Sequence, residues 1–184
     1  TQVTQALWTA IMGNNPSGFG GEDRPVENVS WDDCRKFIRK LNCELRGRLS
    51  GKMFRLPTEA EWEFAARGGN KSEGYRYAGS DELSDVAWFA DNSDGKTHPV
   101  AELEANELGL YDMCGNVWEW CQDWYGDYPR NTQTNPTGPS NGSGRVFRGG
   151  SWYVGAWVCR LSYRFYYAPG RCYDDLGLRL VLSE

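Results

Sequence analysis

The residues best suited to chemistry are six cysteines and one histidine, and they are spread along the chain. Thiolates form disulfides, attack electrophiles or bind soft metal ions. No Cys-x-x-Cys pair occurs and His98 is the only histidine, so the pattern argues against a zinc site. Cys34 and Cys43 fall on one predicted helix, about 13 Å apart at its rise per residue, too far to bridge. Cys114 and Cys121 pair only if the run between them turns back, so we expect mostly buried, unpaired thiols.

The charge balance makes nucleic acid an unfavourable partner. The chain has 20 Lys and Arg against 25 Asp and Glu, a net charge of −5, although a local basic cluster is compatible with that total. No stretch approaches the ~18 apolar residues of a membrane helix, so no transmembrane segment is expected in this chain. The 184 residues fit a single domain over 1–184. Because the chain opens as if inside a domain, we expect its N-terminus to be truncated.

Two segments have the spacing and the start signals of helices. Ser30 is an N-cap with an acidic residue three positions on, and the apolar stripe that follows is Cys34, Phe37, Ile38, Leu41 and Leu45. Thr58 and Glu61 form a second capping box before a short amphipathic run that stops at Gly68. Beyond Gly68 the density of Gly, Pro, Asn and Asp predicts short elements and many turns. Residues 127–144 are predicted to form an exposed excursion.

Residues 145–184 combine a regular framework with a variable-looking, tyrosine-rich set of positions. That composition is typical of a binding surface, where Tyr supplies contact area at low entropic cost. Trp152, Trp157, Leu176, Leu178 and Leu180 are interpreted as framework, and Arg160, Arg164 and Arg179 as donors of structural hydrogen bonds. The candidate ligand-binding positions are Tyr153, Val154, Gly155, Val158, Leu161, Tyr163, Phe165, Tyr166, Tyr167, Ala168, Arg171, Cys172 and Tyr173.

The alternative for these aromatic residues is ordinary core packing, which Tyr and Phe in a terminal β segment usually provide. Phe165, Tyr166 and Tyr167 are consecutive, however, and successive side chains of a strand point to opposite faces. At least one of the three is therefore expected to be exposed, and a surface aromatic patch usually marks an interaction site. We accordingly favour binding for Tyr166, Tyr167 and Tyr173.

Four ordered motifs cover nearly the whole chain: RPVENVSW at 24–31, FRLPTEAEWE at 54–63, GLYDMCGNVWEW at 109–120 and RGGSW at 148–152. Together they resemble the formylglycine-generating enzyme, or sulfatase-modifying factor, family. The resemblance implies an α+β fold of the C-type-lectin-like kind, with two helices near its start and much irregular structure. The two helices agree with the capping argument made from the residues alone.

The enzymes of that family use two cysteines, five residues apart, to hold copper and oxidise a substrate cysteine. Cys159 matches the second of these positions, but the first is Val154, which cannot bind a metal ion. Cys172 lacks the family's spacing, and Cys159 is interpreted as a packed structural residue. Iron-dependent oxygenases with this fold need several histidines. The sequence therefore predicts that the protein is not an enzyme and requires no cofactor.

The non-catalytic branch of the fold fits better, because the chain is similar to the variable proteins of diversity-generating retroelements, such as those of Treponema. Those genes are rewritten at adenines, so that AAC codons become NNC codons, which never encode Trp, Lys, Glu, Gln or Met. Between Tyr153 and Tyr173 the last four types are absent, and the single tryptophan, Trp157, occupies a framework position. The pattern agrees with such diversification of residues 145–184.

The resemblance also implies a structural calcium site. The matching positions are Asp112 and Glu119 as carboxylates, with Gly115 and Val117 as backbone carbonyls, and hard oxygen donors suit Ca²⁺. The alternative is that Glu119 forms an internal salt bridge and Asp112 caps a turn.

Taken together, the sequence and its resemblance predict a variable, receptor-like or adhesin-like ligand-binding protein with a tyrosine-rich surface on a C-type-lectin scaffold. Its expected partner is a protein or glycan on another cell. The resemblance places it at the bacterial cell surface, with a lipid anchor in a missing N-terminal segment. Two alternatives remain: a formylglycine-generating oxidase or its inactive homologue, and an invariant carbohydrate- or protein-binding module.

Overall fold

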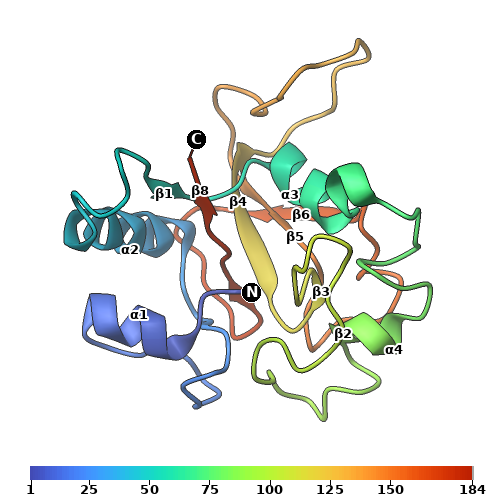
Figure 1. The fold of residues 1–184 in the computed structure, drawn as a ribbon, viewed down its shortest axis with the longest axis horizontal. Coiled ribbons are helices and arrows are strands. Elements are labelled where there is room, and N and C mark those ends of the chain that lie inside the picture. The colour runs from blue at the N-terminus through green and yellow to red at the C-terminus, as the bar shows by residue number, and fades with distance from the viewer. Residues whose placement is uncertain (184) are drawn as a thin grey trace.

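The first predicted helix is present as α2 (Trp31–Glu44) in the structure, a computed structural model that describes residues 1–183 (Figure 1). The Ser30 side chain accepts a hydrogen bond from Asp33 N, and the Asp33 carboxylate accepts one from Ser30 N. This reciprocal capping box satisfies two backbone donors at the helix start. The predicted apolar stripe is buried at Cys34, Phe37, Ile38 and Leu41.

The second predicted helix is α3 (Glu59–Ala66), which begins at the capping box formed by Thr58 and Glu61. A further helix, α1 (Gln5–Met12), lies outside the two predicted from periodicity. The Thr4 side chain caps it by accepting from Leu7 N, and Gly13 ends it in the left-handed conformation. Trp8 stacks on Phe37 of α2, and the half-buried Ile11 and Met12 pack in the same cluster. In eight residues this apolar stripe is shorter than the window over which a helical period can be recognised.

The rest of the described chain forms short elements joined by loops, as its content of turn residues predicts. They are the 3₁₀ helix η1 (Gly69–Lys71), α4 (Leu83–Val86), β1 (Phe54–Arg55), β2 (Ala87–Trp88), β3 (Cys114–Gly115), β4 (Trp118–Trp124), β5 (Arg145–Arg148), β6 (Arg164–Tyr167), β7 (Leu176–Gly177) and β8 (Val181–Leu182). Residues 127–143 are exposed and form the long loop at the top of Figure 1, which confirms the predicted excursion.

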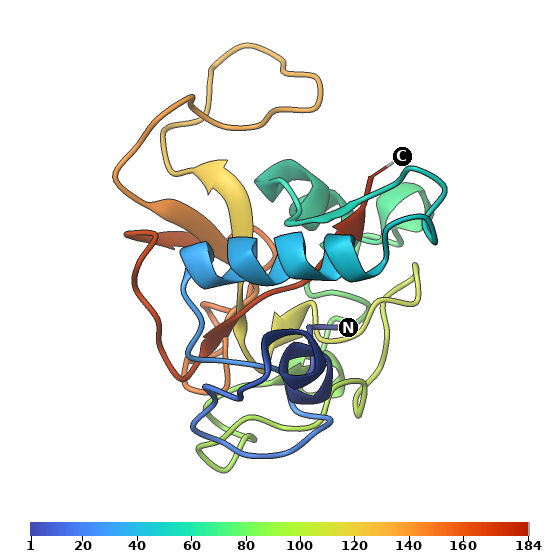
Figure 2. The same ribbon diagram turned by 90° about the vertical axis from the view of Figure 1, so that its left-hand side faces the viewer.

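The central sheet has four strands in the order β6-β5-β4-β7. β5 pairs antiparallel with β4 and with β6, whereas β7 joins the other side of β4 in parallel. In the β5–β6 ladder Phe147 lies opposite Phe165 and Val146 lies opposite Tyr166. β6 is therefore an edge strand of this sheet, and it carries three consecutive aromatic residues to the surface. Figure 2 shows α2 crossing in front of the sheet.

The two faces of the sheet are covered by different hydrophobic clusters. Trp118 and Trp120 of β4 and Phe147 of β5 pack in the cluster that contains α1 and α2. Cys121 of β4 and Val146 of β5 point the other way, into the cluster that contains α3. This alternation is the two-residue period of a strand. Helices lie in both clusters, together with irregular segments, and this mixture around an antiparallel-rich sheet gives the predicted α+β class.

The last residues of the described chain return to the N-terminal half. β8 pairs antiparallel with β1, with Leu182 opposite Phe54. Val3 N donates to Leu178 O at 2.9 Å, so the C-terminal segment is also bound to the residues before α1. Residues 145–183 are thus built into the fold at several points, and substitutions among them are tolerable only where the side chains face solvent.

Candidate functional site

Seven aromatic side chains from the C-terminal segment gather at one region of the surface. We call them the aromatic surface: Tyr153, Trp157, Tyr163, Phe165, Tyr166, Tyr167 and Tyr173. Five are exposed, to 71% for Tyr153, 63% for Trp157, 43% for Phe165, 40% for Tyr166 and 37% for Tyr173. Six of the rings touch a neighbour in the set or share the buried rings Trp118 and Phe147, whereas Tyr153 packs on the buried Trp152. The predicted exposure of the aromatic run is confirmed.

β6 sets the centre of the aromatic surface. Phe165 and Tyr167 project from one face of the strand onto Phe147, with ring centroids 5.8 and 5.0 Å away. Tyr173 then packs beside Tyr167 at 4.7 Å, so residues six apart in sequence share one patch. Burial, followed by the nearby Tyr173 and Asp175, raises the pKa of Tyr167, so its phenol is neutral at physiological pH.

Tyr166 projects from the opposite face of β6. Its ring stacks on Tyr125 with centroids 4.2 Å apart, and Arg164 lies over the same Tyr125 ring at 4.3 Å. Tyr125 is absent from the predicted site, because its stack on Tyr166 depends on the alignment of segments far apart in the chain. The aromatic surface therefore wraps around the edge of the sheet and does not form a single flat face.

The loop before β6 adds the two most exposed rings. Trp152 is buried, as predicted for a framework residue, and its Nε1 donates to Asp174 O at 3.1 Å. This bond holds Tyr153 near the segment that carries Tyr173. Trp157 had been interpreted as a buried framework residue, and this is wrong: the ring touches Tyr163 edge-on and is otherwise exposed to solvent. Trp157 therefore belongs with the exposed rings of the aromatic surface and not with the core.

Two predicted ligand-binding positions are not on the surface. Val158 is 7% exposed and Leu161 is 3% exposed, and they lie in the two hydrophobic clusters of the core. Short turns around Gly155 bring these side chains inward, a geometry that sequence alone does not reveal. Val158 and Leu161 are therefore core residues, and their prediction as ligand-binding positions is wrong. Val154 and Gly155 are half-buried, and Val154 packs against both clusters.

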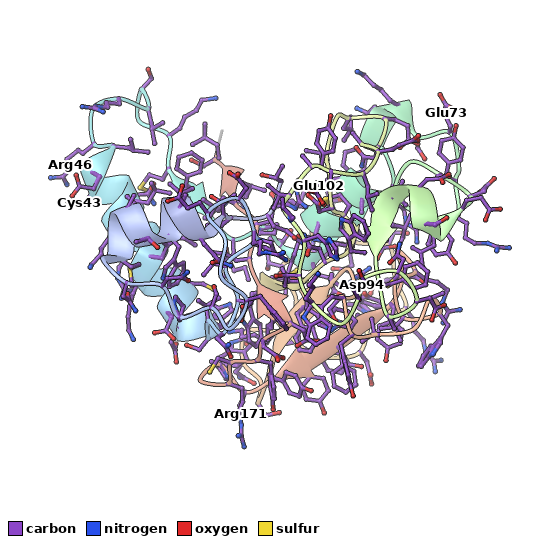
Figure 3. The ribbon with its side chains drawn as sticks, turned by 90° about the horizontal axis from the view of Figure 1, so that it is seen from below. Cys43, Arg46, Glu73, Asp94, Glu102 and Arg171 are labelled. Atoms are coloured by element: carbon purple, nitrogen blue, oxygen red, sulfur yellow. The ribbon has the colours of Figure 1, made fainter. Side chains whose placement is uncertain are left out.

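The remaining candidates lie on the turn after β6. Ala168, Arg171 and Cys172 are exposed, and Arg171 N donates to Ala168 O at 3.0 Å to close the turn. Arg171 projects into solvent at the edge of the molecule in Figure 3. This turn places a cation and a free thiol beside the aromatic rings.

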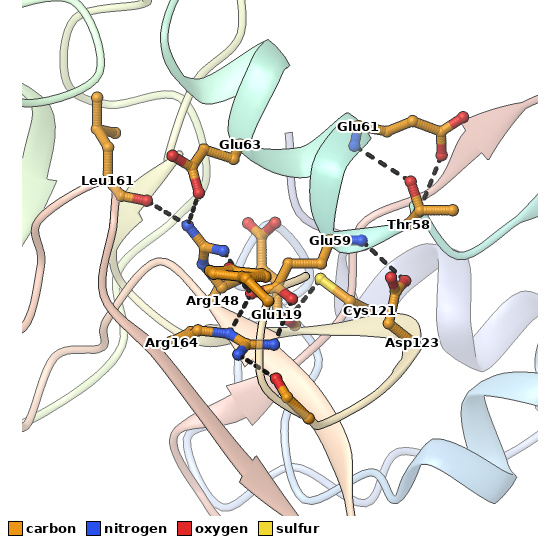
Figure 4. A network of polar contacts seen from close by, with 12 residues as sticks. Thr58, Glu59, Glu61, Glu63, Glu119, Cys121, Asp123, Arg148, Leu161 and Arg164 are labelled. Carbon is orange, nitrogen blue, oxygen red and sulfur yellow. Dashed lines mark hydrogen bonds and ion pairs between the residues drawn. The ribbon is translucent and has the colours of Figure 1, made fainter. Parts of the chain in front are cut away.

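A buried network of charges supports β6 from beneath (Figure 4). Glu59, at the start of α3, accepts from Arg148 of β5 at 2.6 Å and from Arg164 of β6 at 2.6 and 2.7 Å. Arg148 also donates to Glu63 at 2.6 Å. Asp123 accepts from Glu59 N at 2.9 Å, and burial raises its pKa to about 6. The predicted structural role of Arg164 is confirmed, whereas no sequence signal marks Glu59 as its partner.

The cysteines are arranged for packing. Cys34, Cys114, Cys121 and Cys159 are buried, Cys43 and Cys172 are exposed, and all six are unpaired. Cys159 lies against Gly150, where an added Cβ would stand 2.6 Å from its Sγ. Burial raises the pKa of the Cys159 thiol, so the reactive thiolate is suppressed at neutral pH. Val154 occupies the position five residues earlier.

The oxygens that the family resemblance assigns to calcium accept hydrogen bonds from two side chains of the protein, Gln2 and Arg179. Gln2 Nε2 donates to Val117 O at 2.9 Å and to the carbonyls of Asp112 and Gly115 at 3.3 Å each. Both oxygens of Glu119 accept from Arg179 at 2.9 Å. An amide group thus stands where the carbonyls converge, and the residues present do not fit a calcium ion.

Both carboxylates instead have partners within the protein. Glu119 is 1% exposed and ion-paired with Arg179, which confirms the predicted structural role of that arginine. Asp112 accepts from Ala101 N at 2.9 Å, a bond that closes the loop between these two residues. Within residues 1–183 no group of three or more His, Cys, Asp and Glu side chains is placed to hold a metal ion. In the same residues no helix is long and apolar enough to span a membrane.

The chain is similar in sequence and structure to several known proteins. The chain is 33% identical to chaperone protein LppX of Paenibacillus barcinonensis, over all of its own length and 78% of that protein. It is 36% identical to the formylglycine-generating enzyme of Streptomyces coelicolor, over 96% of the chain but 58% of the enzyme. The solved structure of Treponema denticola variable protein 1 superposes with a TM-score of 0.90 at 38% identity, covering 97% of this chain and 81% of that one.

The chain therefore has the C-type-lectin-like fold of the formylglycine-generating enzyme type, which confirms the predicted fold. All of residues 1–184 match the family described as the sulfatase-modifying factor enzyme 1-like domain, and this chain belongs to that family.

Proposed function

We propose that this protein is a non-catalytic receptor or adhesin that binds its ligand through the aromatic surface. The ligand is a protein or glycan on another cell, and the protein acts at the bacterial cell surface. The observation that carries the proposal is the exposure of five large rings on one framework, although burying each ring would lower the free energy of the folded protein. Tyr and Trp provide large contact area with few rotatable bonds, as in other binding surfaces.

We propose further that the exposed positions vary by retroelement-directed substitution. The likeness to a Treponema denticola variable protein supports this, and so does the absence of Lys, Glu, Gln and Met between Tyr153 and Tyr173. The structure is compatible with variation, because Tyr153, Phe165 and Tyr173 face solvent and their framework neighbours are buried. Trp157 is then an invariant contact residue among variable ones, since an NNC codon cannot encode tryptophan.

The competing oxidase function has weaker support in this chain. The residue five positions before Cys159 is Val154, and the Cys159 thiol is fully buried with a raised pKa. Thiolate ligands are needed to hold Cu(I), and a single protonated thiol does not supply them. We therefore propose that ligand binding, and not cysteine oxidation, is the activity of this chain.

Sequencing of the segment that encodes residues 145–184 across a population tests the diversification. Substitutions confined to exposed positions such as Tyr153, Phe165, Ala168 and Tyr173, with a nearby adenine-bearing copy of the segment, are expected. An unchanging segment without a copy would contradict it and leave an invariant module of the same fold. Substitutions at Leu161 would also contradict the assignment of that position to the core.

Binding of the labelled protein to cells of co-occurring bacteria tests the surface itself. F165A/Y173A should weaken cell binding by at least about tenfold, because hot-spot aromatic residues carry most of an interface. Phe64 is 55% exposed on α3, so F64A is a matched control for loss of an exposed ring. Equal loss in both variants, or unfolding of F165A/Y173A with no effect of W157A, would refute the proposed surface.

A further inference from the structure

Positive charge is concentrated in one segment of this acidic chain. Residues 35–55 contain eight of the twenty Lys and Arg residues but a single acidic one, Glu44, which leaves twelve basic and twenty-four acidic residues elsewhere. Such asymmetry within one domain indicates an electrostatic partner for the basic side. We call this set the basic face, and it consists of Arg35, Lys36, Arg39, Lys40, Arg46, Arg48, Lys52 and Arg55.

The fold spreads these residues over a broad exposed surface. Arg35, Lys36, Arg39 and Lys40 form the solvent side of α2, and Arg46, Arg48 and Lys52 extend it along the following loop. The helix alone is about 20 Å long at its rise per residue. Figure 3 shows Arg46 at one side of the molecule and the acidic Glu73 at the other. The charge is therefore separated in space as well as in sequence.

Most of these cations have no carboxylate partner among the described residues. Lys36 pairs with Asp33 at 2.9 Å and Arg55 pairs with Glu61 at 2.6 Å, and no other member of the basic face is ion-paired in that part of the chain. Arg35 lies over the Trp31 ring at 5.0 Å. Unneutralised cations that repel each other cost stability, which a binding role would explain.

A groove of about 530 Å³ runs between α2 and β1 within this region. Apolar side chains lie among the cations that line it. Met53 is 60% exposed, and Phe54 and Ile38 form part of the wall, while Arg39 and Arg46 flank the groove. Exposed apolar groups surrounded by Lys and Arg are typical of segments that rest on a lipid interface.

We propose that the basic face binds the anionic phospholipid headgroups of a membrane surface. Lys and Arg near such a surface each add to the attraction, and Met53 has the position of a shallow apolar insertion. Nucleic acid is disfavoured, because base stacking needs exposed rings, and here Trp31 is buried and Phe54 is half-buried. The breadth of the face fits a planar array of headgroups better than one small anion.

The basic face extends along the solvent side of α2 and past its second end, whereas the aromatic surface lies near the first end of the helix. Asp32 N, at the first end, approaches Pro169 O of the turn after β6 at 3.4 Å, whereas Arg46 and the basic loop follow the second end. A membrane bound at the basic face thus leaves the aromatic rings free. The inference stands independently of the proposed ligand-binding function, because different residues carry it.

Flotation of the purified chain with lipid vesicles tests this proposal. Binding is expected to vesicles that contain about 30% phosphatidylglycerol and not to neutral phosphatidylcholine vesicles, and to fall in high salt. R39E/K40E should lower the partition coefficient at least about tenfold. K71E/R76E is the matched control, because these residues are also exposed and the change in net charge is the same. Both variants are checked for native circular dichroism and melting temperature.

The outcome separates this site from the aromatic surface and from general charge effects. F165A/Y173A should bind the vesicles as the unchanged chain does, and R39E/K40E should keep its binding to cells. Equal loss in R39E/K40E and K71E/R76E would overturn the proposal, because net charge alone would then explain binding. Failure to bind anionic vesicles, or tighter binding to duplex DNA than to vesicles, would overturn it as well.

Discussion

Replacing Arg148 by methionine should destabilise the protein without touching its surface. The Arg148 side chain is fully buried, donates to Glu59 and Glu63 at 2.6 Å each, and also donates to the carbonyl of Leu161. Methionine has a similar length and no charge, so R148M keeps much of the packing against Trp62 but leaves the two carboxylates short of a partner.

The size of the stability loss in R148M depends on the partners that Glu59 and Glu63 keep. Breaking a buried ion pair by removing one partner costs about 3–5 kcal/mol. Glu59 keeps its two bonds to Arg164, and Glu63 keeps Arg67 at the surface, so the lower end of that range is expected. A loss of about 3 kcal/mol lowers the melting temperature of a chain of this size by about 6–12 °C.

Equilibrium urea unfolding, followed by tryptophan fluorescence and circular dichroism, measures this loss. R67M is the control, because the Arg67–Glu63 pair is exposed and should contribute about 0.5 kcal/mol or less. Adding E63Q to R148M should recover part of the stability, since one unpaired carboxylate is removed. A loss below about 1 kcal/mol in R148M, or no recovery in the double variant, would refute the view that this network supports β6.

Three further predictions concern titration, metal and thiols. Burial raises the pKa of Glu27 to about 7, so the folded protein favours the protonated carboxyl. The stability that this group contributes is present below its ordinary pKa and is lost as the pH rises through about 7. The melting temperature of E27Q should therefore lack this decline, and a parallel decline in both proteins would disprove the assignment. Calcium or a chelator should leave the melting temperature unchanged, whereas a rise with calcium would mean that the Gln2 amide turns its unpaired oxygen toward an ion. In the native protein a thiol reagent should react rapidly with Cys43 and Cys172 alone, and fast reaction of Cys159 would contradict its burial.

The helices were predictable because their signals are local. A capping box at Ser30 or Thr58 is complete within four residues, and the stripe of α2 repeats at the helical period. α1 has a cap at Thr4, but its apolar stripe of Trp8, Ile11 and Met12 is too short for the helical period to repeat. The excursion at 127–143 was predictable from its turn residues alone.

The site was only partly predictable, because exposure in an irregular segment depends on distant partners. Val158 and Leu161 were placed on the surface by composition, yet turns direct them into the core. Trp157 was assigned to the framework because of its type, yet the chain directs its ring outward. Tyr125 lies just after β4 and Glu59 begins α3, and only the assembled fold brings them to β6.

The structure explains how β6 can carry changeable side chains at all. Arg164 sits on the strand immediately before the aromatic run, and its bonds to Glu59 and to Gly126 O tie the strand to α3 and to the end of β4. The ladder with β5 supplies the backbone hydrogen bonds regardless of side-chain identity. The geometry of Phe165 and Tyr166 is therefore set by an arginine and by the backbone, so their replacement should cost binding before it costs folding.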